Sequence, residues 1–353
     1  MLFIYTVLVI RLFWNTVHNT NMQTKQSVFP YLPTLEETAF AKYLAVPELR
    51  RLIDVGMHCG LEYTSFPFYK DLTPYSRFGH SVGVAAICSI FSSDPRVAIS
   101  GLLHDIATPC FAHVVDFLNG DHTTQESTES DTRKIIASSK QIMSLLREDG
   151  ISLDEVADYH LYPIADNDSP KLSADRLEYT LSNFINFNVM SLDEALRLFH
   201  DIESGTNEMG EVELVFNHEE CALRFALGSI RNGLVYIADE DRFSMEYLAR
   251  KLASAISLQI ISREDLMTTE PKLIEKLCLD PRGAKSWDAF RSLNKIKSSV
   301  HPVEGAFKIP AKKRYIDPYV KGKGRLSSIN KEFALEVQKF LSFSFEGYLK
   351  AEE

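Results

Sequence analysis

Three short motifs in the first half of the chain carry histidines and aspartates that could bind a metal ion. His80 stands in YSRFGHSVGVA, the adjacent pair His104-Asp105 in GLLHDIATP, and Asp175 in KLSADRLEYTLSN. Imidazole nitrogens and carboxylate oxygens together suit a divalent transition metal. Neighbouring side chains on a helix point about 100° apart, so His104 and Asp105 can reach one ion only at a helix end or kink. Pro109 supplies a reason for such an end.

Each motif taken alone has a simpler explanation. A His-Asp pair is most often a capped helix terminus, where both side chains meet backbone groups. A charged pair that follows the apolar residues GLL on a buried helix is costly, however, unless it is paired or bound to a metal. The three motifs in this order therefore favour a metal site over three unrelated polar positions.

In order and in helical context, RFGHSVGVA, LLHDIATPCFAH and SADRLEYTLSN resemble the HD-domain phosphohydrolases, which are named for their His-Asp pair. The resemblance covers about residues 40–190 and is greatest to the branch that contains the deoxynucleoside triphosphate triphosphohydrolases. It implies a divalent metal ion, one of Mn, Fe, Mg, Co or Ni, and it implies that the metal ligands are His80, His104, Asp105 and Asp175.

The same resemblance implies roles for five further residues. Arg77, Arg176 and Tyr179 would contact the substrate, and a planar guanidinium suits phosphate. His113 and His122 would act in catalysis, by protonating a leaving oxygen or holding phosphate, because the pKa of imidazole is near neutral. The alternatives are a surface salt bridge for Arg77, core packing for Tyr179 and simple solvation for His122.

The chain departs from the triphosphohydrolase pattern at three places. That branch usually has a Glu directly after the histidine at the position of His122, whereas this chain has Thr123 and offers Glu126 instead. Asn183 stands where the branch has an Asp two turns after its last ligand. We find no Gln at the position that reads deoxyribose. The sequence thus supports the metal centre better than it supports a dNTP substrate.

Most of the elements that must position these side chains have the apolar periodicity of helices, and only 212–216 and 306–320 alternate as strands do. The sequence therefore predicts a mostly α fold, a compact HD-domain helical bundle with a C-terminal α-helical extension and a few short strands. The expected helices cover 35–53 with a restart at Pro47, 77–91, 95 to the residues before Pro109, 112–148 around the polar stretch Asn119–Asp131, 152–159, 173–187, 191–200, 219–238, 242–261 and 270–278.

Three regions are expected along the chain. Residues 1–30 form a tail, 31–205 an HD domain, and 206–353 a mostly helical region packed on it. The apolar stretch Leu2–Trp14 is shorter than the roughly 20 residues of a membrane span and has neither a basic leader nor a cleavage site. Residues 1–21 are read either as an upstream translation artefact or as a targeting segment.

The composition of the chain limits the kinds of molecule that it is expected to bind. The 353 residues carry a net charge of −10, which argues against a protein that coats nucleic acid. The basic segment 308–325 holds seven Lys/Arg and one Asp, so the rest of the chain is still more acidic and needs a bound cation to attract phosphate. That segment is read either as solvated surface or as an effector, RNA or oligomer contact. Five scattered cysteines without a Cys-x-x-Cys pair suggest a reducing, cytoplasmic location.

We therefore predict a metal-dependent phosphohydrolase that acts on a phosphate ester or anhydride of a nucleotide or a related small molecule. We expect no membrane partner. We further expect that the protein forms a homo-oligomer. Two other functions stay open. One is a catalytically inactive HD module that binds a nucleotide as a sensor or scaffold. The other is a redox-active di-iron enzyme, in which His113 and His122 would be additional ligands.

Overall fold

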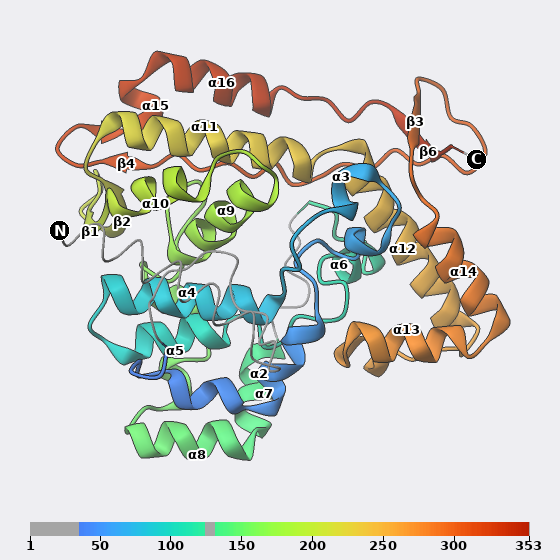
Figure 1. The fold of residues 1–353 in the computed structure, drawn as a ribbon, viewed down its shortest axis with the longest axis horizontal. Helices are drawn as coiled ribbons and strands as arrows, with labels where there is room; N and C mark the ends of the chain where they lie inside the picture. The colour runs from blue at the N-terminus through green and yellow to red at the C-terminus, as the bar shows by residue number, and fades with distance from the viewer. Residues whose placement is uncertain (1–34, 124–130, 353) are drawn as a thin grey trace.

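The computed structural model describes residues 35–123 and 131–352, which form a mostly α fold with a few short strands (Figure 1). This confirms the predicted fold class. The expected tail, including Leu2–Trp14, and Glu126 lie outside the described residues.

Two helices that lie side by side form the centre of the HD part, α4 (Arg77–Phe91) and α5 (Pro95–Leu103) (Figure 1). Ser76 caps α4 by accepting a hydrogen bond from Gly79 N, and Asp94 caps α5 by accepting one from Arg96 N. The second helix was expected to continue towards Pro109, but it ends at Leu103. His104 and Asp105 therefore follow the helix end, as metal binding by both residues requires.

Short elements surround this pair. The helix expected over 35–53 is interrupted, because Val46 is extended before Pro47 and a new helix starts there. The helix expected over 152–159 is replaced by two 3-10 turns, since Asp158 accepts from His160 N and starts a separate turn. The surrounding helices are α2 (Pro47–Arg50), α3 (Pro67–Lys70), α6 (Val114–Leu118), α7 (Thr132–Ser138), α8 (Lys140–Asp149), α9 (Ala174–Asn186) and α10 (Leu192–His200).

The C-terminal region adds longer helices, of which α11 and α16 lie one above the other in Figure 1 and pack together. Three of them, α14, α15 and α16, were not predicted, although Asp280 caps the N-terminus of α14 and Asn330 caps that of α16. The helices are α11 (Glu219–Tyr236), α12 (Asp239–Ser257), α13 (Glu270–Cys278), α14 (Pro281–Arg291), α15 (Leu326–Ile329) and α16 (Lys331–Leu341).

Two small sheets complete the fold. In the larger, β1 (Ile202–Thr206) pairs antiparallel with β2 (Val212–Phe216), and Ile202 lies opposite Phe216. The strand expected at 212–216 is confirmed, whereas only Tyr319–Val320 of the region 306–320 forms a strand. The domain boundary expected at residue 205 falls inside the β1–β2 hairpin. The sheet has the order β1-β2-β4-β5, with β4 (Tyr319–Val320) and β5 (Gly324–Arg325), and the smaller sheet pairs β3 (Ile296–Ser299) with β6 (Tyr348–Ala351).

Two hydrophobic clusters each combine residues from both halves of the chain. The first joins the α4–α5–α9 layer to α11 and α16, for example through Phe184, Phe225 and Phe333. The second joins the turn after α5 to α12 and α14, for example through Phe111 and Trp287. Burial of large aromatic side chains is the main source of stability here. The C-terminal region therefore helps to position the HD motif.

A buried carboxylate, Glu270, ties the start of α13 to the HD part. Its Oε1 accepts from the backbone N–H groups of Gly56 (2.9 Å) and Phe111 (3.2 Å), and its Oε2 accepts from the Tyr63 hydroxyl (2.9 Å). Burial and the neighbouring Glu62 carboxylate raise the pKa of Glu270 to about 7. The folded protein thus holds a proton that an unfolded chain would release near its ordinary carboxyl pKa.

We expect the free energy of unfolding of the wild type, relative to Glu270→Gln, to fall as the pH rises from about 4.5 to about 7. The folded-state pKa is raised, so the proton stabilises the folded state fully below the unfolded pKa and that contribution is lost as pH rises through the folded pKa. Gln keeps the size and the acceptor but does not titrate. Urea unfolding of both proteins across this range measures the difference, and a difference independent of pH contradicts the prediction.

Candidate metal centre

Four side chains meet where α5 ends and where α4 and α9 begin. Donor atoms of His80, His104 and Asp105 all lie within 4.8 Å of one another. Asp175, in the first turn of α9, places Oδ1 3.0 Å from His80 Nε2 and 3.8 Å from His104 Nε2. The structure thus brings together the four residues that the sequence predicts as ligands.

Both imidazoles are anchored through Nδ1. His80 Nδ1 lies 2.5 Å from Glu178 Oε2, and His104 Nδ1 lies 2.7 Å from the carbonyl oxygen of Gly101. When Nδ1 donates to such an acceptor, Nε2 carries the lone pair that a metal ion needs. Two imidazoles with two carboxylates on one side are a donor set that fits a divalent transition metal.

Negative charge dominates the centre. Burial alone would lower the pKa of His80, but hydrogen bonds with Asp175 and Glu178 raise this pKa to about 10. Burial would raise the pKa of Asp105, but Arg77 and the two histidines hold it below its ordinary value. A metal ion at this centre therefore has to compete with a proton on His80.

Arg77 belongs to the centre. Its Nη1 lies 3.0 Å from Asp105 Oδ2, and only 10% of its side chain is exposed, so this ion pair is buried and is not a surface salt bridge. Its buried Nε has no hydrogen-bond partner among the described residues. An anionic oxygen from a substrate would satisfy that donor.

Arg176 is engaged elsewhere. Its Nε donates to Lys171 O at 2.7 Å, Nη2 donates to Asn167 O at 2.5 Å, and Nη1 lies 2.9 Å from Asp166 Oδ1. All three guanidinium nitrogens therefore hold the loop before α9. This geometry argues for a bracing role and against the phosphate contact expected from the sequence.

His113 opens α6 and is oriented by its own helix. Its Nδ1 lies 2.9 Å from Asp116 Oδ2, a pairing that leaves Nε2 for another partner. Phe111 (φ 62°) and Ala112 (φ 46°) have left-handed backbones, so His113 follows an uncommon turn between α5 and α6. Burial lowers the pKa of His113, Asp116 opposes this, and the charges of Arg314 and Arg77 lower it further.

His122 is held by a distant helix. Its Nε2 lies 2.8 Å from Glu246 Oε2 on α12, its Nδ1 lies 3.3 Å from Gly120 O, and its ring centre is 4.4 Å from that of Phe117. The carboxylate that the chain lacks at Thr123 is thus supplied from α12. Both ring nitrogens have partners, so a direct role of His122 in proton transfer would require one of these contacts to break.

Tyr179 faces α11 and lies beside a polar cluster. Its ring is 6.4 Å from that of Tyr236, and burial raises the pKa of Tyr179 to about 12, so the phenol stays neutral. Asn183 donates to the Tyr236 hydroxyl at 2.8 Å, and its Oδ1 lies 3.3 Å from His58 Nε2. Burial lowers the pKa of His58 to about 4. The side-chain amide of Asn183 is therefore hydrogen-bonded to neutral side chains of the protein itself.

Three acidic residues near these histidines were not among the sequence predictions. Asp116 follows His113 by three residues and Glu178 follows Asp175 by three, so a helical-face argument could have found both. No local signal indicates Glu246, which reaches His122 only through the packing of α12 against α6.

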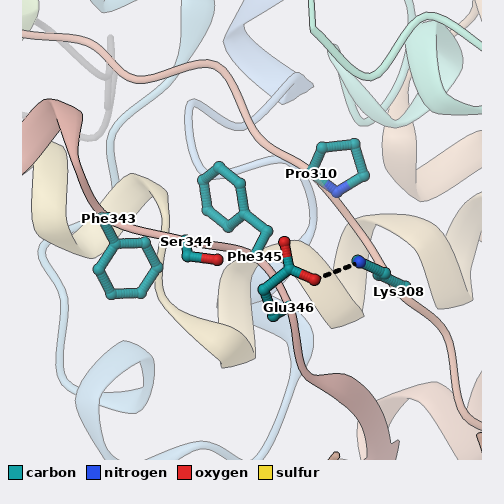
Figure 2. Close-up of a pocket in the computed structure, with 6 residues that line it drawn as sticks. All are labelled: Lys308, Pro310, Phe343, Ser344, Phe345 and Glu346. Atoms are coloured by element: carbon teal, nitrogen blue, oxygen red, sulfur yellow. Dashed lines mark hydrogen bonds and ion pairs between the residues drawn. The ribbon is translucent and has the colours of Figure 1, made fainter.

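A separate pocket of about 540 Å³ lies in the C-terminal region, between the chain at Lys308 and the chain after α16 (Figure 2). An ion pair between Lys308 and Glu346 (2.6 Å) crosses it. It contains none of the predicted site residues and is lined by Lys308, Pro310, Phe343, Ser344, Phe345 and Glu346.

Comparisons with known proteins agree with this geometry. Residues 77–178 match the family model described as the HD domain. The uncharacterized protein YdhJ of Bacillus subtilis is 26% identical over 251 residues, which are 69% of this chain and 74% of YdhJ. The metal-dependent phosphohydrolase cns2 of Cordyceps militaris is 23% identical over 175 residues, which are 48% of this chain and 47% of cns2.

Two solved structures have a similar fold. A phosphohydrolase from Bacteroides thetaiotaomicron aligns with a TM-score of 0.61 at 15% identity, covering 90% of this chain and 96% of that chain. A hypothetical protein from Aquifex aeolicus aligns with a TM-score of 0.53 at 18% identity, covering 74% of this chain and 73% of that chain. At these identities the likeness is one of fold alone.

Every helix in residues 35–123 and 131–352 is too short or too polar to cross a membrane. The HD-domain match begins at Arg77 and ends at Glu178, so it contains the whole of the metal centre and its hydrogen-bonded support. Residues 77–178 of this chain thus carry an HD domain, and the imidazole and carboxylate donors that converge in it fit a divalent metal ion as cofactor.

Proposed function

We propose that this protein hydrolyses a phosphate ester or anhydride of a nucleotide or a related small molecule, with a divalent metal ion held by His80, His104, Asp105 and Asp175. The observation that carries this proposal is the convergence of imidazole and carboxylate donors within 4.8 Å, with Arg77 3.0 Å from Asp105. The bound metal would lower the pKa of water and polarise a phosphoryl oxygen.

Arg77 neutralises the phosphoryl group. Its Nη1 is fixed by Asp105, so the guanidinium is already oriented, and its buried Nε is the donor left for a substrate oxygen. Donors fixed before reaction stabilise developing charge without reorganisation.

His113 protonates the leaving oxygen. Asp116 anchors its Nδ1, which leaves Nε2 to carry the transferred proton. The lowered pKa of His113 makes its imidazolium a stronger acid, which helps the leaving group depart.

The other predicted residues act around this core. Tyr179 contacts the substrate with a neutral phenol, and Arg176 braces the loop before α9. His122 contacts phosphate when its hydrogen bond to Glu246 or to Gly120 O opens. We extend the proposal to a cytoplasmic protein, which the five unpaired cysteines support, and to a homo-oligomer. A dNTP is one member of the substrate class.

The test uses protein stripped of metal by a chelator and reloaded separately with Mn, Fe, Mg, Co or Ni. We expect hydrolysis of at least one substrate among nucleoside mono-, di- and triphosphates and p-nitrophenyl phosphate with at least one metal, and none after chelation. Asp105→Asn, which removes a ligand charge at constant size, is the control. Tight nucleotide binding without turnover under all metals would favour the inactive sensor or scaffold instead.

A further inference from the structure

The two oxygens of the Asp105 carboxylate have different neighbours. Oδ2 faces the imidazoles of the metal centre, since it lies 3.7 Å from His104 Nε2 and 4.0 Å from His80 Nε2. Oδ1 accepts a hydrogen bond from the Thr108 hydroxyl at 2.7 Å. Only 14% of the Asp105 side chain is exposed, which leaves the carboxylate little room to turn towards solvent. One oxygen is therefore directed to the metal centre and the other is held by Thr108.

The turn that carries Asp105 and Thr108 is fixed on several sides. Thr108 N donates to Asp105 O at 2.9 Å, so the main chains of the two residues are linked as well. Arg51, which follows α2, donates through Nη2 to the carbonyl oxygens of Ile106 (3.0 Å) and Thr108 (2.8 Å). Its Nη1 donates to Thr268 O (3.1 Å), shortly before α13. Hydrogen bonds from a charged donor are stronger than those between neutral groups, so the Thr108 hydroxyl is kept beside Oδ1.

Positive charge already stands beside the other oxygen. Arg77 Nη1 lies 3.0 Å from Asp105 Oδ2, the same atom that faces the imidazoles. Two ions in a dinuclear centre lie about 3.5–4 Å apart, and a carboxylate that bridges them gives one oxygen to each. A second ion beside Asp105 would have to displace the Thr108 hydroxyl from Oδ1, and it would also be repelled by the Arg77 guanidinium.

The two histidines considered as ligands of a second ion have partners of their own. Both ring nitrogens of His122 are engaged, by Glu246 Oε2 at 2.8 Å and by Gly120 O at 3.3 Å. Nδ1 of His113 is paired with Asp116 Oδ2. In the part of the chain that the structure describes, a single group brings three His, Cys, Asp or Glu donors within 4.8 Å of one another, and it lies at the end of α5. The described residues thus offer a ligand set for one ion.

We infer that Thr108 positions Asp105 as a ligand through Oδ2 alone, so that the centre binds one metal ion per chain. This inference rests on the proposed function, which requires a metal ion but leaves the number of ions open. With a single ion, Arg77 supplies the second positive charge at the phosphoryl group, and His113 rather than a second ion assists the leaving oxygen. A di-iron enzyme, which needs two ions, does not fit this arrangement.

The first experiment counts the ions. Equilibrium dialysis of the metal-free full chain against Mn(II) gives the bound ions per chain, and the same measurement on His104→Ala shows how many of them belong to the centre. We expect His104→Ala to lose one ion. We also expect the wild type to give the electron paramagnetic resonance spectrum of isolated Mn(II), because coupling needs two ions about 4 Å apart. Loss of two ions, or a coupled spectrum, overturns the inference.

The second experiment removes the hydroxyl that holds Oδ1. Thr108→Val keeps the shape of the side chain without the donor, and we expect the affinity for Mn(II) to fall about 10-fold, as when a group that orients a metal ligand is lost. Thr108→Ser restores the hydroxyl and should return the affinity to within about 2-fold of the wild type. A hydroxyl that only stabilised the fold would change the midpoint of unfolding and leave the Mn(II) affinity unaltered, and that result contradicts the positioning role.

Thr64→Val is the matched control. The Thr64 hydroxyl also donates to the residue three positions earlier, at 2.6 Å, but its acceptor is Leu61 O, which is not part of the metal centre. Thr64→Val should therefore bind Mn(II) as tightly as the wild type, and a loss equal to that of Thr108→Val overturns the role of Thr108. Thr108→Ala makes the same comparison if Thr108→Val fails to fold. If the wild type and His104→Ala bind equal amounts of each of Mn, Fe, Mg, Co and Ni, it is the proposed function that fails.

Discussion

Replacing His104 by alanine should remove metal binding and hydrolysis together. The substitution deletes one of the three donor groups that lie within 4.8 Å of one another. It also deletes the imidazole whose Nδ1 is held by Gly101 O, so no neighbouring side chain can take its place in the same orientation. Because a bound metal contributes several kcal/mol to phosphoryl transfer, we expect turnover to fall by about a thousandfold or more. Metal content per chain and kcat on the best substrate measure the two effects.

A matched histidine separates ligand loss from general damage. His218 has 64% of its side chain exposed and pairs with Asp201, and it makes no contact with the metal centre. His218→Ala should therefore bind as much metal as the wild type and hydrolyse as fast. If His104→Ala retained full metal content and turnover, the centre assigned to the end of α5 would be wrong.

The sequence carries good information about the ligands because their geometry is local. His104 and Asp105 are adjacent, so a helix end alone decides whether both can face one point, and α5 does end at Leu103. His80 and Asp175 lie near the starts of capped helices, where Ser76 and Ser173 mark the first turn. Capping residues and apolar periodicity can be recognised in the sequence alone, and they determine where the helices that carry these side chains begin.

The contacts of Arg176 and Glu246 depend on packing that the sequence pattern does not show. Arg176 follows a ligand by one residue, yet its guanidinium is taken up by the loop at 166–171. Glu246 reaches His122 from 124 residues away. The short 3-10 turns near 153 and 159 replaced an expected helix for a related reason, since a three-residue turn carries too few positions to show a period.

Substitution of Glu178 is expected to weaken metal binding without removing a ligand. Its Oε2 holds His80 Nδ1 at 2.5 Å and also accepts from the Tyr75 hydroxyl, and its Oε1 accepts from Ser182 Oγ at 2.9 Å. Glu178→Ala deletes the support that orients His80, so we expect metal affinity to fall by about 10- to 100-fold, with a matching loss of activity at limiting metal. Titration with the preferred metal, followed by calorimetry, measures the affinity.

Glu178→Gln separates the charge of this support from its hydrogen bonds. The amide oxygen can still accept from His80 and Tyr75, and the amide nitrogen can donate to Ser182 Oγ, so the orientation of His80 is kept while its basicity falls. We therefore expect a loss of metal affinity smaller than that of Glu178→Ala. Glu213→Gln is the matched control, because Glu213 is equally buried but pairs with Arg325 in the sheet. Glu213→Gln should lower the free energy of unfolding and leave metal affinity unchanged. If Glu178→Ala likewise lowered stability alone, Glu178 would support only the packing of α4 against α9 and not the metal centre.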